Sequence, residues 1–89
     1  MTAPEQVWDA GICIVIAWTT VRNRSPWPGV VEVIEDVHAC VWLRAGAVKD
    51  IDRARAHLAT LEPARGNVYT FPASEPDPLG RARALVVRS

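Results

Sequence analysis

The stretch ICIVIAW, residues 12–18, is continuously apolar over the length of one β-strand. A strand with one solvated face alternates apolar and polar residues, whereas a strand covered on both faces shows an unbroken run of this kind. Read with a period of two, the run has a bulky face of Ile12, Ile14, Ile16 and Trp18, and a smaller face of Cys13, Val15 and Ala17. The pattern predicts a strand at the centre of a sheet.

The segment that follows, residues 26–36, fits two structures. Its β-branched residues and the turn-forming sequence SPWPG before them favour a second strand, paired antiparallel to the first. Four apolar residues between Val30 and Val37 also recur at helical spacing, and the Ser-Pro pair ahead of them suits the start of a helix. Gly29 and the valine-rich composition weigh against a short helix. We therefore expect a strand, with a helix over 26–36 as the alternative.

Residues 37–44 alternate as a strand does, with one face made of Val37, Ala39, Val41 and Leu43. A helix over about residues 48–61 follows, because Ile51, Ala54, Leu58 and Leu61 repeat at helical spacing and Pro63 stops a further turn. Residues 68–72 predict another short strand, and the proline-rich loop 72–80 follows it.

The last segment, residues 78–88, also allows two structures. Leu85, Val86 and Val87 favour a final strand, which is our expectation. The alternative is a helix that begins at Asp77, with Pro78 in its first position.

These elements predict one α+β domain over residues 1–89. We expect a small, mostly antiparallel sheet of four to five strands, with the helix at about 48–61 on one face and the other face uncovered. A helix at 26–36 would instead give a βαβαβ order and a partly parallel α/β sheet. An uncovered face and an exposed edge both favour association with another protein.

The charge balance argues against a general attraction to polyanions. The chain has 89 residues, of which ten are basic and ten acidic, and its formal net charge is zero. No global field would therefore draw in nucleic acid or an anionic membrane. Lys49 is the one lysine, and the abundance of arginine and alanine indicates a GC-rich genome, such as that of a bacterium, a bacterial virus or a mobile element.

Three features predict a cytoplasmic protein without a membrane segment. Cys13 and Cys40 are too few for a disulfide framework, so we interpret them as reduced core thiols. The opening sequence MTAPEQVWDAG lacks the basic region of a signal peptide. The apolar run of residues 12–18 is too short to span a bilayer.

Candidates for catalysis or for a metal site are weak. No glycine-rich phosphate loop is present, so we expect no nucleotide cofactor. His38 and Cys40 lie two apart on a strand, with Cys13 or His57 as further candidate ligands, but zinc needs three or four well-placed ligands. Neighbours two apart on a strand are roughly 7 Å apart at their α carbons, too far for a nucleophile and its base. We predict no metal, no cofactor and no enzymatic activity.

Acidic residues gather at Glu32, Glu35 and Asp36. At the edge of a sheet such residues favour solubility and discourage pairing with a further strand. We assign them no catalytic role.

Arginine and tryptophan residues supply the candidate binding sites. Large aromatic residues outside a core are typical of protein interfaces, and arginine beside them adds a charged contact. The predicted protein interface consists of Arg22, Arg24, Trp27, Trp42 and Arg44. The alternative is an anion or nucleic-acid site made of Arg22, Arg24, Arg81 and Arg83, with Trp27 as a stacking surface.

The sequence thus predicts a small, non-enzymatic protein that acts by protein contact. It would be a homodimer, an accessory subunit or an inhibitor of a larger assembly. The alternative is a module that binds nucleic acid or an anionic ligand through its arginines.

Overall fold

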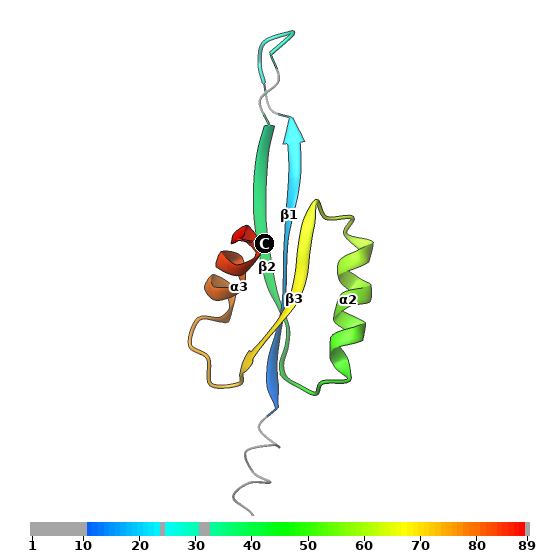
Figure 1. Cartoon of the computed structure of the whole chain (residues 1–89), viewed down its shortest axis with the longest axis vertical. Coiled ribbons are helices and arrows are strands. Elements are labelled where there is room, and N and C mark those ends of the chain that lie inside the picture. The colour runs from blue at the N-terminus through cyan, green and yellow to red at the C-terminus, as the bar shows by residue number, and fades with distance from the viewer. Residues whose placement is uncertain (1–10, 24, 31–32, 89) are drawn as a thin grey trace, which may run out of the picture.

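Strand β1 (Ile12–Asn23) lies at the centre of a three-stranded sheet, between β2 (Val33–Gly46) and β3 (Arg65–Pro72) (Figure 1). Both neighbours pair with it antiparallel. The computed structural model describes residues 11–23, 25–30 and 33–88, and in them helices α2 (Asp50–Thr60) and α3 (Pro78–Arg88) complete an α+β fold. The predicted fold class and the central position of the ICIVIAW strand are confirmed.

The predicted number of strands is wrong, because the described residues form three strands and not four to five. The count is lower partly because the two strands predicted at 26–36 and 37–44 are one continuous strand, β2. The alternative helix at 26–36 is also wrong, since Val33–Asp36 belong to that strand and pair with the end of β1.

Alternation along β1 divides the core into two clusters, one on each face of the sheet. The bulky face packs against α2, where Ile14 and Ile16 meet Ala54 and Leu58. The smaller face packs against α3 and joins Cys13, Val15 and Ala17 to Phe71, Ala82 and Val86. Helix α2 confirms the helix predicted at about 48–61, and its two buried residues, Ala54 and Leu58, lie one turn apart.

The carboxyl-terminal segment is the helix α3, so the strand expected over residues 78–88 is wrong. Asp77 begins this helix, because its Oδ1 accepts a hydrogen bond from the backbone N–H of Gly80 at 3.1 Å. Ala82 and Val86, four residues apart, are fully buried against the sheet. A capped start and a helical row of buried residues outweigh the local β propensity of the Leu-Val-Val sequence. The expectation of an uncovered sheet face is wrong for the same reason, since α3 covers it.

The β1–β2 hairpin continues beyond the rest of the molecule (Figure 1). Pairing of β1 with β3 ends at Thr19 opposite Arg65, whereas pairing with β2 continues to Asn23 opposite Val33. We call the two-stranded part the hairpin arm: residues 20–23 and 33–36 with the connecting loop, of which residues 25–30 are described. The predicted hairpin between these strands is confirmed.

A β-bulge interrupts β2 near its other end. Val15 pairs with Val41, but the next partners are Ile14 and Leu43, so β2 carries one extra residue there. Leu43, expected on the same inward face as Val41, is displaced to the surface.

None of the described helices is long and apolar enough to cross a bilayer.

Candidate interaction site

A tight turn forms the tip of the hairpin arm, at Trp27, Pro28, Gly29 and Val30. The backbone N–H of Val30 donates to the carbonyl of Trp27 at 3.3 Å. Pro28 in the second position and Gly29 in the third, with a φ of 81°, are the residues that a type II turn requires. The backbone N–H of Trp27 also donates to the hydroxyl of Ser25 at 3.2 Å. These contacts hold the tip in one local conformation.

The tip presents apolar side chains to solvent. Trp27 is 70% exposed, and Val30 beside it is exposed as well. Further down the arm, Val21 and Val33 are exposed on the face that α3 covers elsewhere, because that helix ends at Arg88, before the arm begins. We call Trp27, Val30, Val21 and Val33 the arm surface.

The predicted interface residues do not all share this surface. Arg22 and Trp27 both belong to the arm, and the Nε of Arg22 lies 3.1 Å from Oδ2 of Asp36 in an exposed ion pair. Arg24 falls outside the described residues. Arg44 is exposed near the bulged end of β2, far along the strand from the arm.

Trp42 belongs to the core and not to the arm. It is half-buried in the cluster under α2, and its ring centroid lies 4.9 Å from that of His57 on the helix. Trp18 and His38 stack beside them, with centroids 5.3 Å apart. Among the tryptophans that the structure describes, the one exposed to a partner is therefore Trp27. Trp8 lies outside the described residues.

His38 and Cys40, the residues considered for metal or nucleophile chemistry, have structural surroundings. The Nε2 of His38 lies 3.1 Å from Oγ1 of Thr20, in a hydrogen bond between adjacent strands. Burial raises the pKa of the Cys40 thiol, which opposes formation of the nucleophilic thiolate. Within the described residues, no three histidine, cysteine or acidic side chains gather as a metal site would require.

The basic residues of the alternative anion site are dispersed. Arg81 binds Glu75 at 3.0 Å, and its guanidinium lies over the ring of Phe71. Arg83 follows two residues later on α3 and so points to the other side of the helix, about 200° around its axis from Arg81. Arg22 lies on the opposite face of the sheet, because it shares the α2 side with Trp18.

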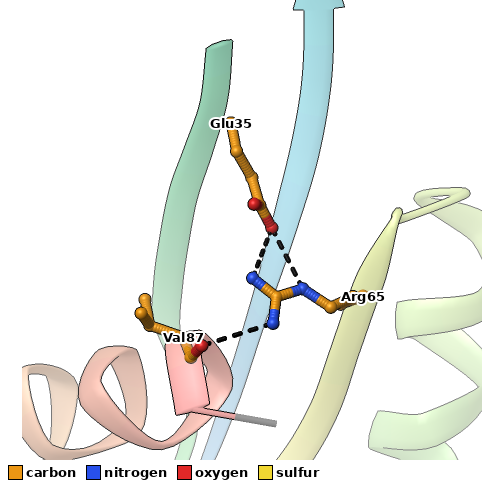
Figure 2. A network of polar contacts seen from close by, with 3 residues as sticks. All are labelled: Glu35, Arg65 and Val87. Atoms are coloured by element: carbon orange, nitrogen blue, oxygen red, sulfur yellow. Dashed lines mark hydrogen bonds and ion pairs between the residues drawn. The ribbon is translucent and has the colours of Figure 1, made fainter. Parts of the chain in front are cut away.

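Arg65 is a key polar residue that sequence reasoning missed. It reaches from β3 across β1, and its Nε and Nη2 donate to Oε1 of Glu35 on β2 at 3.0 and 2.6 Å (Figure 2). Its Nη1 donates to the carbonyl oxygen of Val87 at 3.3 Å, at the end of α3. The Arg65 contact is the main cause that lowers the pKa of Glu35 below its ordinary value. Thirty residues separate the two ionic partners, so no local pattern signals the pair.

Comparison with protein-family models, with curated proteins and with solved structures found no match to this chain.

Proposed function

We propose that this chain is a non-enzymatic, protein-binding accessory protein that contacts its partner through the arm surface. The exposed indole of Trp27 at the tip of a projecting hairpin is the observation that carries the proposal. Burial of such a group in a partner would lower the free energy of the complex substantially, because its apolar surface would leave water.

The local geometry supports a role as a binding anchor. Tryptophan is among the residues most enriched at the energetic centres of protein interfaces. The turn at Pro28 and Gly29 holds the tryptophan backbone, so less conformational entropy is lost on binding than from a mobile loop. Val30, whose backbone N–H bonds to the carbonyl of Trp27, adds a second exposed apolar side chain to the tip.

The chemistry of the arm suggests what the partner offers. Arg22 is paired with Asp36, and Glu35, the remaining charged residue in the described part of the arm, is paired with Arg65 of β3. The tip itself is apolar. A matching partner would present an apolar cleft deep enough for an indole, with a polar rim that faces the Arg22–Asp36 pair.

The proposal places the protein in the cytoplasm. Cys13 and Cys40 lie in clusters on opposite faces of the sheet and remain free thiols, which suits a reducing compartment.

The test uses a photo-crosslinking amino acid in place of Pro26, which is exposed beside Trp27 and leaves the indole in position, in the chain expressed in cells of its source organism. The captured protein is identified and purified, and its Kd for the unmodified chain is measured by calorimetry. We expect Trp27→Ala to weaken that binding by about thirtyfold, the effect of losing one interface hot spot.

Val48→Ser is the matched control, because Val48 is 73% exposed but lies in the turn before α2, away from the arm. It should leave the Kd unchanged. A partner that binds Trp27→Ala and Val30→Ser as tightly as the unmodified chain would contradict a role for the arm.

A further inference from the structure

The outer edge of β2 is a second surface with unused bonding capacity. β2 is an edge strand of fourteen residues, whereas most strands have five or six. It pairs with β1 on one side, and no described strand pairs with its other side. Every second residue there directs a backbone N–H and C=O away from the sheet, where another strand could bond to them.

The distal part of this edge lacks the usual protection against pairing. Edge strands commonly carry proline, lysine or a bulge that blocks a further strand. From Val33 to Val41 the register with β1 is unbroken, and the segment contains no proline and no lysine. The bulge lies beyond Val41, so it blocks pairing only in the last third of the strand.

The acidic residues of the segment are neutralised within the chain. Glu35 binds Arg65 at 2.6 Å, and Asp36 lies 3.1 Å from Arg22. We expected these carboxylates to discourage edge pairing, but with their charges compensated they repel an approaching strand much less.

The side chains along the edge are incompletely covered. On β1, every residue from Cys13 to Ala17 is buried by the two helices. On β2, every residue from Asp36 to Trp42 is half-buried, on both faces of the sheet. A further strand beside β2 would remove much of this remaining apolar surface from water.

We propose that a second copy of this chain pairs antiparallel with the outer edge of β2, with the twofold axis at Val37. A twofold antiparallel pair places residues of the same sheet face opposite each other. The nine regular residues Val33–Val41 overlap completely only when Val37 lies opposite Val37 of the second copy. The two sheets then form one continuous sheet of six strands.

Side-chain chemistry selects the same register. Asp36 then faces His38 of the second copy, Ile34 faces Cys40, and Val33 faces Val41. An axis at Asp36 would instead set two carboxylates opposite each other. An axis at His38 would place Asp36 against a thiol and bring the bulge into the pairing.

The first test is the molecular mass of the full chain by sedimentation across a concentration series. We expect a dimer, and Trp27→Ala should leave it unchanged, so this result is separate from the function proposed for the arm. A monomer at every concentration would overturn the proposal.

The second test fixes the register by disulfide formation in a Cys40→Ala background. Val37→Cys places two thiols at the axis, where α carbons about 4.5 to 5.5 Å apart suit a disulfide. Ala39→Cys is the matched control, because each Ala39 lies roughly 13 Å along the strand from its copy. We expect a covalent dimer from the first variant alone. Equal crosslinking of both variants would overturn the register.

A charge exchange tests the facing pair without a thiol. His38→Asp puts carboxylates opposite Asp36 at two symmetric positions and should weaken the dimer about tenfold. Adding Asp36→His again places a histidine opposite a carboxylate at each of these positions and should recover most of that loss. A double variant weaker than the single variant would count against the axis at Val37.

Discussion

Arg65 and Glu35 join the two outer strands of the sheet across the central one, through two hydrogen bonds to a single carboxylate oxygen. The same guanidinium binds the last turn of α3 through the carbonyl of Val87. One side chain therefore links β3, β2 and α3 at the place where the three-stranded sheet ends and the arm begins.

The charge of Glu35 should make stability depend on pH. Arg65 holds the pKa of this carboxyl below its ordinary 4.5, so Glu35 stabilises the fold above that pH and loses its contribution as the pH falls through the lowered pKa. Glu35→Gln should therefore lower Tm at neutral pH, and the difference from the unmodified chain should shrink as the pH falls below 4.5 and through the lowered pKa of Glu35. Circular dichroism melts across this range measure the effect.

Asp52→Asn is the control for that series, because its ion pair with Arg55 is exposed on α2 and should contribute little. A Tm difference for Glu35→Gln that stays constant with pH would assign the loss to packing and not to charge.

The amino-terminal cap of α3 should make a measurable contribution to stability. Asp77→Ala removes the acceptor for the Gly80 N–H and should cost about 1 kcal/mol. In a domain of this size that lowers Tm by roughly 4 to 8 °C. Asp77→Asn keeps an acceptor and should lose much less. Equal losses for the two variants in thermal melts would show that the cap is not the cause.

Two adjacent valines of α3 should contribute differently to stability, because only one side of the helix is buried. Val86→Ala leaves a cavity against the sheet and should lower the free energy of unfolding by about 2 kcal/mol. Val87→Ala removes an exposed side chain and should change it by less than about 0.5 kcal/mol. Urea denaturation compares them. Similar losses at both positions would contradict the packing of α3 on the sheet.

The two candidate interface tryptophans should behave differently. Trp42→Ala removes a half-buried ring from the cluster under α2 and should cost about 2 kcal/mol. Trp27→Ala should change the free energy of unfolding by less than about 0.5 kcal/mol, because its ring is exposed. Urea midpoints of the two variants decide the matter, and a large loss for Trp27→Ala would mean that the tip packs within the chain.

The thiols should react slowly in the folded protein. Burial raises the pKa of Cys40 above its ordinary 9.0, so less thiolate is present near pH 8 than in a free cysteine. Cys13 is buried and should react only after unfolding. Alkylation followed by mass spectrometry gives both rates. Fast labelling of Cys40 at neutral pH would contradict its surroundings in the structure.

Sequence periodicity was sufficient where one local pattern agreed with the packing. The unbroken apolar run identified β1 as a strand covered on both sides, and the apolar residues of α2 recur at one helical spacing. The loop SPWPG could be assigned to a hairpin because proline and glycine select a turn by their backbone angles alone.

Periodicity failed where β propensity and capping disagreed. The Leu-Val-Val sequence near the end of the chain favours a strand, but Asp77 and Pro78 start a helix and the sheet buries residues four apart. Of the two tryptophans proposed for the interface, Trp27 is exposed, whereas Trp42, equally aromatic, is half-buried beside α2. No property of either residue alone distinguishes the two.

The sequence by itself determined the local elements that depend on neighbouring residues: the central strand, the turn at its end and the middle helix. Only the tertiary structure decided which faces and edges remain open, since that depends on residues distant in the chain. Arg65 meets Glu35 across 30 residues of sequence. Helix α3 covers the sheet face that was expected to be uncovered when residues 78–88 were predicted to form a strand. Burial is a property of the assembled layers, and among the described residues it left the arm and the outer edge of β2 exposed.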